Sequence, residues 1–109
     1  MIPTPEEPVV RRDQLPLPHA YVAPRTPTER RLAEIWRTVL SMDRVGVEDT
    51  YYDLGGDSFL AATIFGMIEE VFKVTIPLAA LAEAPTIAAL ARRVDHGLSD
   101  HANRRPLSK

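Results

Sequence analysis

The chain has 109 residues, 45% of them hydrophobic and 26% charged, which gives room for one small domain with a single core. A formal net charge of -2 provides no concentrated basic face, so neither nucleic acid nor an anionic membrane is an expected partner. The absence of cysteine excludes disulfides, a thiolate nucleophile and cysteine-ligated metals, and cytoplasm is the expected location.

The first 24 residues are rich in proline, which removes backbone hydrogen-bond donors and favours extended conformations. We therefore predict a leader or linker over 1–24 and a folded domain over 25–97. The last residues show no periodicity, so a disordered tail is predicted over 98–109. No apolar run approaches the roughly 20 residues that cross a bilayer, and the N-terminus does not resemble a secretory signal.

The first helix is predicted over 27–40. Thr26 can cap it, Pro27 suits its first position, and Glu29 completes a capping box. Its apolar residues recur with helical spacing and predict one buried face, formed by Leu32, Ile35, Trp36, Val39 and Leu40. Glu29 and the other charged residues of this helix are expected to face water.

The helical period is lost over 41–57, which predicts a long loop. Five apolar side chains are expected to anchor this loop to the core, namely Val45, Val47, Tyr51, Tyr52 and Leu54.

Three further helices follow this loop. The second is predicted over 57–72, with a buried stripe formed by Leu60, Ile64, Ile68 and Val71. A short third helix should run from Pro77 to Ala82 and pack Leu78 and Leu81. Thr86 should cap the fourth, which turns Ile87, Leu90, Ala91 and Val94 inward and ends at Gly97. The predicted fold is an all-α, four-helix bundle with three main helices, one short helix and a long first loop.

A paired-glycine turn delivers a serine to the start of the second helix. Gly55 and Gly56 permit positive φ and close backbone approach, which would leave the Ser58 side chain accessible. Unpaired N–H groups and the positive end of the helix dipole would favour a phosphodiester at Ser58. Asp57 and Ser58 are also common helix caps, so a purely structural role remains open at this point.

Other chemistries of this serine lack their partner residues. A hydrolase elbow needs Gly-x-Ser-x-Gly, but position 60 is Leu60, and the three histidines lie in or near the chain ends. The Gly-Lys-Ser/Thr of a phosphate-binding loop is absent, and Gly55 occupies the second ligand position of a calcium loop after Asp53. No metal site is predicted.

Residues 49–58, Asp-Thr-Tyr-Tyr-Asp-Leu-Gly-Gly-Asp-Ser, resemble the core motif of peptidyl carrier, or thiolation, domains of nonribosomal peptide synthetases. This is a phosphopantetheine-binding carrier family. Further similar segments lie at 21–29, 76–78 and 83–87, so the resemblance covers roughly 21–94 in the family's order. Tyr51 and Tyr52 stand where the family frequently has phenylalanine.

The resemblance implies that Ser58 accepts a 4'-phosphopantetheine arm from coenzyme A through a separate, magnesium-dependent phosphopantetheinyl transferase. The new thiol would hold aminoacyl or peptidyl intermediates as thioesters, so the chain would be a non-catalytic, monomeric carrier. The residues around the attachment point would be Leu54, Gly55, Gly56 and Asp57, and the likeness places Asp57 near the metal and coenzyme of the transferase.

The resemblance also implies partner domains, namely adenylation, condensation and thioesterase domains or a tailoring enzyme. These would meet the loop before Ser58, the second helix and the short third helix. The residues expected to contact them are Phe59, Thr63, Met67 and Leu78, with Phe59 and Met67 forming an exposed apolar patch.

Three alternatives remain open. An acyl carrier of polyketide or fatty acid type would bear the same arm with another cargo. A helical interaction module would keep the fold with Ser58 unmodified, and a serine hydrolase would react with a fluorophosphonate.

Overall fold

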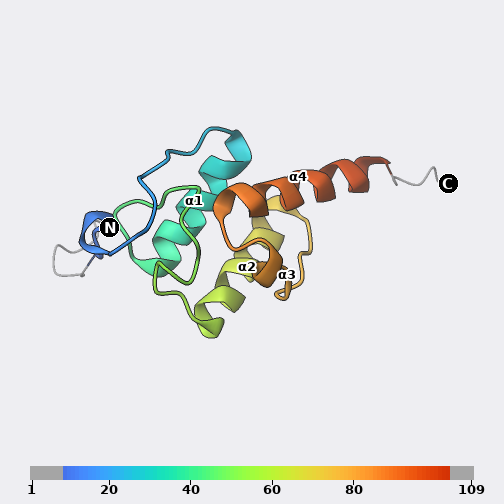
Figure 1. Ribbon diagram of the computed structural model, residues 1–109. Helices are drawn as coiled ribbons and strands as arrows, with labels where there is room; N and C mark the ends of the chain where they lie inside the picture. Colours follow the sequence, from blue (N-terminus) through green and yellow to red (C-terminus); the bar gives the residue numbers. More distant parts are fainter. Residues whose placement is uncertain (1–8, 104–109) are drawn as a thin grey trace, which may run out of the picture.

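The computed structural model describes residues 9–103, with side chains described as far as Leu98. Four α-helices follow one another (Figure 1): α1 (Pro27–Leu40), α2 (Ser58–Phe72), α3 (Ala80–Glu83) and α4 (Ile87–Asn103). A 3-10 turn, η1 (Arg12–Gln14), precedes them, and α1 packs against both α2 and α4. The predicted all-α bundle of three main helices and one short helix is confirmed. None of the helices between residues 9 and 103 has the length and hydrophobicity needed to cross a bilayer.

The helix α1 begins and ends at the predicted residues, and its start is set by local N-terminal signals. The Glu29 N–H donates to Thr26 Oγ1 at 3.0 Å and the Thr26 N–H donates to Glu29 Oε1 at 3.4 Å, which is a complete capping box. The prediction that Glu29 faces water is wrong, because its carboxylate is buried against Arg25. Burial alone would raise the pKa of Glu29, but hydrogen bonds from Arg25 and Thr26 outweigh it and lower that pKa.

One hydrophobic core joins α1, the long loop and the later helices. Trp36 lies fully buried in it and meets Tyr51 edge to face, with ring centroids 5.5 Å apart. Four of the five predicted loop anchors are buried, namely Val45, Val47, Tyr51 and Leu54. The fifth, Tyr52, is 60% exposed, so that prediction is wrong: Tyr51 takes the inward position and turns its neighbour outward.

The buried face of α2 is centred on Ala61, Ile64, Phe65 and Ile68. The predicted stripe is therefore confirmed for Ile64 and Ile68 and wrong for Leu60 and Val71. Leu60 is half-buried and Val71 exposed, because both lie at one border of the buried face.

The helix α3 begins at Ala80, three residues later than the predicted start at Pro77. The carbonyls of Pro77 and Leu78 accept the N–H groups of Ala80 and Leu81, so residues 77–79 form the turn that enters the helix. Leu81 is buried as predicted. Leu78 is exposed, so the prediction that it packs into the core is wrong.

The helix α4 has the predicted cap, since Thr86 Oγ1 accepts the Ala89 N–H at 3.2 Å. Its inward residues are also confirmed, because Ile87, Leu90, Ala91 and Val94 are all buried. The prediction that Gly97 ends this helix is wrong. A β-carbon at position 97 would come within 2.7 Å of Val74, so this glycine permits close packing inside the helix. Residues 98–103 of the predicted tail are therefore helical (Figure 1), and 104–109 lie outside the described residues.

Residues 9–22 of the predicted leader lie along the bundle. The Val10 N–H donates to the Ser41 carbonyl at 2.8 Å, and the Val10 carbonyl accepts the Asp43 N–H at 2.9 Å. Farther along, the Val22 carbonyl accepts the Val47 N–H at 2.9 Å. This segment therefore contacts both the end of α1 and the long loop.

A buried ion pair also holds the N-terminal segment against the long loop. Arg12, 7% exposed, donates from Nε and Nη2 to the two oxygens of Asp49, which is 2% exposed, with both distances 2.6 Å. Arg12 Nη2 also donates to the His19 carbonyl at 2.9 Å, and Asp49 accepts the Gly46 N–H. The division into leader, domain and tail stays a prediction, but residues 9–22 are packed rather than freely extended.

Candidate functional site

The turn before α2 is shaped by two glycines with different requirements. Gly55 has a φ of 88°, in the left-handed region that favours glycine. Gly56 lies against the Tyr51 ring, and a β-carbon there would overlap that ring. Leu54 is buried and anchors the start of the turn. Glycine is thus needed at position 55 for its backbone and at position 56 for its small size.

Ser58 is the first residue of α2, and its side chain is exposed. Asp57 precedes it as the N-cap, and Asp57 Oδ1 accepts the Leu60 N–H at 2.9 Å. The capping role considered for Asp57 is therefore present, and its role toward a transferase stays a prediction. The first-turn amides and the helix dipole make the surroundings of Ser58 favourable for negative charge.

The hydroxyl of Tyr51 reaches this helix start. It donates to the carbonyl oxygen of Asp57 at 2.7 Å, and the same oxygen accepts the N–H of Ala61 at 2.9 Å. Burial and the neighbouring Asp57 carboxylate raise the pKa of Tyr51, so the hydroxyl stays protonated and remains a donor.

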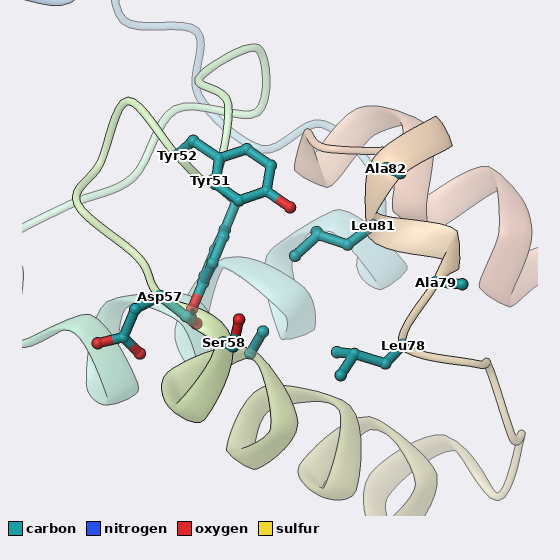
Figure 2. A pocket seen from close by; sticks show the side chains of 9 residues that line it. Tyr51, Tyr52, Asp57, Ser58, Leu78, Ala79, Leu81 and Ala82 are labelled. Atoms are coloured by element: carbon teal, nitrogen blue, oxygen red, sulfur yellow. Dashed lines mark hydrogen bonds between the residues drawn. The ribbon is translucent and has the colours of Figure 1, made fainter.

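A cavity of about 150 Å³ opens beside Ser58. Figure 2 shows the Ser58 hydroxyl turned toward the space between Tyr51 and Leu81, with Leu78 on the far side. Its lining comes from the loop before α2, the first turns of α2 and the α3 region, and consists of Tyr51, Tyr52, Asp57, Ser58, Ala61, Leu78, Ala79, Leu81 and Ala82. The site therefore combines the exposed Ser58 hydroxyl with a hollow that is lined mainly by apolar and aromatic side chains.

The residues predicted to meet partners are not all equally accessible. Phe59 is 77% exposed, and Thr63 is exposed one turn later. Leu78 is exposed at the rim of the cavity. Met67 is half-buried against the core, so the prediction that Phe59 and Met67 form one exposed patch is wrong. Met67 lies at the border of the buried face of α2, whereas Phe59 lies opposite that face.

Sequence reasoning missed two features of the site. It assigned Tyr51 to the core but gave its hydroxyl no role, and it did not predict that Ala79 and Ala82 line a hollow beside Ser58. The tyrosine in a position frequently held by phenylalanine was an available signal for the first feature. Nothing in the local pattern marked the second, because it depends on how α3 packs against the loop.

Among the residues that the structure describes, no cluster of three or more His, Cys, Asp or Glu side chains could hold a metal ion. His19 and His96 are not among the residues that line the cavity of Ser58. The side chain of His101 lies outside the described residues.

The sequence is similar to single segments of very large peptide synthases. It is 41% identical over 95 residues to gramicidin S synthase 2 of Brevibacillus brevis, covering 81% of this chain and 2% of the relative. It is 42% identical over 90 residues to tyrocidine synthase 3 of Brevibacillus parabrevis, covering 76% of this chain and 1% of the relative. The chain thus spans only a small fraction of the length of these relatives.

The fold is similar to solved carrier structures. An active-site mutant of a peptidyl carrier protein superposes with a TM-score of 0.71 and 34% identity, covering 74% of this chain and 90% of that one. A peptidyl carrier protein in complex with coenzyme A and the phosphopantetheine transferase Sfp gives a TM-score of 0.68 and 37% identity over 70% of this chain and 99% of that one.

A family profile described as "Phosphopantetheine attachment site" matches residues 30–94, which is more than half of the chain and includes most of α1, the glycine turn, α2 and α3. The predicted resemblance is confirmed by this match and by the peptidyl carrier structures. The chain therefore belongs to the phosphopantetheine-binding carrier family, as a carrier domain of the peptidyl type.

Proposed function

We propose that Ser58 is the residue to which 4'-phosphopantetheine is attached, and that the domain carries aminoacyl or peptidyl groups between partners in nonribosomal peptide synthesis. The observation that carries this proposal is the position of Ser58, exposed as the first residue of α2 directly after the Gly55–Gly56 turn. Within the matched segment 30–94, the other serine is Ser41, which lies at the opposite end of α1 from the capping box.

The surroundings of Ser58 fit the group. The Ser58 oxygen would form the phosphodiester, whose negative charge would lie at the positive end of α2. The apolar side chains of Leu78, Leu81 and Ala61 provide a surface beside it for the carbon skeleton of the arm. Gly55 and Gly56 would shape the approach, whereas buried Leu54 would act by anchoring the turn.

When bound, phosphopantetheine supplies a thiol that holds acyl cargo as a thioester. The chain has no cysteine of its own, so this external thiol is the one through which it would work. The Ser58 cavity has no histidine in its lining, which supports a carrier without catalytic activity rather than a serine hydrolase. A cytoplasmic location likewise stays a prediction.

The proposed partners are a phosphopantetheinyl transferase and the adenylation, condensation and thioesterase domains of a synthetase, or a tailoring enzyme. Solved relatives support two of these partners, since one peptidyl carrier protein is in complex with a phosphopantetheine transferase and another is part of an A-PCP structure with phenylalanyl-adenylate. The contact surface that we propose consists of three exposed side chains, namely Phe59 and Thr63 on α2 and Leu78 at the cavity of Ser58. Peptide synthases among the relatives favour a peptidyl cargo over a polyketide or fatty acid cargo.

The test is intact-protein mass after incubation with coenzyme A, magnesium and a broad-specificity phosphopantetheinyl transferase. The native chain and a Ser41→Ala control should each gain one phosphopantetheine, and Ser58→Ala should gain none. Absence of a gain in the folded, initially unmodified native chain would instead support the interaction module that is never modified. Fluorophosphonate labelling of Ser58 would support the hydrolase.

A further inference from the structure

Tyr51 is held in place by contacts of both its ring and its backbone. Its ring is 1% exposed and packs edge to face against Trp36 of α1. Its backbone N–H donates to the carbonyl of Pro85 at 2.8 Å, in the connection between α3 and α4. The side chain therefore has one orientation, fixed by elements that are distant from α2 in the sequence.

The hydroxyl of Tyr51 connects this fixed side chain to the peptide group before Ser58 by a hydrogen bond. It donates to the Asp57 carbonyl, which belongs to the peptide bond between Asp57 and Ser58. The other contacts of Asp57 in this region, from the N–H groups of Leu60 and Ala61, come from α2 itself. The hydroxyl bond is thus the one among these contacts that ties the start of α2 to the rest of the core.

The glycine turn closes around the same ring. Gly56 lies so close to the Tyr51 ring that a β-carbon would overlap it. The N–H groups of Leu54 and Gly56 both donate to the Tyr51 carbonyl, each at 3.2 Å. Tyr51 therefore contacts the glycine turn through its carbonyl and its ring, and the start of α2 through its hydroxyl.

We propose that Tyr51 is a positioning residue for modification, whose hydroxyl fixes the Asp57–Ser58 peptide group and so presents the Ser58 oxygen in one orientation to the transferase. This inference rests on the proposed attachment at Ser58. A ring alone would fill the core equally well, so the role belongs to the hydroxyl.

The decisive variant is Tyr51→Phe, which removes one oxygen and keeps the ring. Tyr21→Phe is the matched control, because Tyr21 lies in the N-terminal segment under the Arg44 guanidinium, 4.2 Å from its ring centroid, and not in the cavity of Ser58. In the unmodified proteins, Tyr51→Phe should speed amide hydrogen exchange at Gly56, Leu60 and Ala61, whose N–H groups are hydrogen-bonded, by roughly fivefold, as expected for loss of one net hydrogen bond. Exchange in the middle of α1 and α4 should stay within about twofold of native, on the same local-opening argument.

The second readout is steady-state transfer by the phosphopantetheinyl transferase. Tyr51→Phe should lower kcat by roughly fivefold with little change in KM for the carrier, because the serine is bound but less well oriented. Gly56→Ala should lower it further, since the added carbon pushes the turn away from the ring. Tyr21→Phe should behave as native in both measurements.

Two outcomes would overturn the inference: native exchange and native kcat in Tyr51→Phe, or a uniform rise of exchange in all helices, which would make the hydroxyl a general stabilising group. Failure of the proposed function gives a different result, because the native chain itself would then remain unmodified. The exchange measurement does not depend on modification and would still report whether the hydroxyl holds the start of α2.

Discussion

The buried pair between Arg12 and Asp49 makes a strong prediction about stability. Arg12→Ala removes two hydrogen bonds of 2.6 Å to Asp49 and one to the His19 carbonyl. The Asp49 carboxylate is 2% exposed, and of the N–H groups that donate to it only that of Gly46 would remain. Removing one partner of a buried pair typically costs about 3–5 kcal/mol. A domain of this size has a total free energy of unfolding of order 5–15 kcal/mol, so the loss should be a large part of it.

The assay is urea unfolding followed by far-ultraviolet circular dichroism. Arg12→Ala should lower the midpoint strongly, and Arg12→Lys should recover only part of the loss because an ammonium cannot form the bidentate contact. Arg11→Ala is the control, since Arg11 is exposed and pairs with the exposed Asp13. A double-mutant cycle with Asp49→Asn should be strongly non-additive.

An Arg12→Ala midpoint equal to that of Arg11→Ala would refute the reasoning. It would mean that this ion pair contributes little to holding the N-terminal segment on the bundle.

Three further predictions concern single sites. Glu29 has a lowered pKa in the folded chain. The stability that it contributes is therefore present above its ordinary pKa of about 4.5 and is lost as pH falls through the folded value. The free energy of unfolding of Glu29→Gln should depend less on pH than that of the native chain in this acidic window. Asp57→Ala should cost about 1 kcal/mol in urea unfolding through loss of the α2 cap, and no loss would show that the Leu60 N–H finds another acceptor. Phe59→Lys should slow aminoacyl loading by an adenylation partner and leave the melting temperature unchanged, because Phe59 is exposed. Met67→Lys should lower the melting temperature, because Met67 is half-buried against the core. Equal melting temperatures of the two variants would contradict this difference.

The helix α1 and the caps of α2 and α4 could be predicted because each depends on neighbours within four residues. Thr26 and Glu29 form one capping box, and Asp57 and Thr86 accept N–H groups three residues ahead. The glycine turn and the exposed Ser58 followed from the same local chemistry. Family resemblance then supplied the cofactor, which no periodicity could have given.

The remaining features depend on contacts between distant parts of the chain. Arg12 and Asp49 are separated by 37 positions, and a proline-rich stretch gives no sign that its arginine will be buried. In the sequence Gly97 indicates a helix end, and only its packing against Val74 in the folded chain explains a glycine inside the helix. The hydroxyl of Tyr51 could be assigned a partner only after the turn was folded over its ring.

The environment of Trp36 provides a built-in optical reporter. It is the single tryptophan of the chain, its indole is shielded from solvent, and its Nε1 has no hydrogen-bond partner among the described residues. Emission excited at the red edge of the absorption band therefore comes from one fluorophore in an apolar setting, in contact with Tyr51. Loosening of the Tyr51 contact that admits water to the indole would shift this emission to longer wavelength, so the state of the serine-bearing turn can be followed in unlabelled protein.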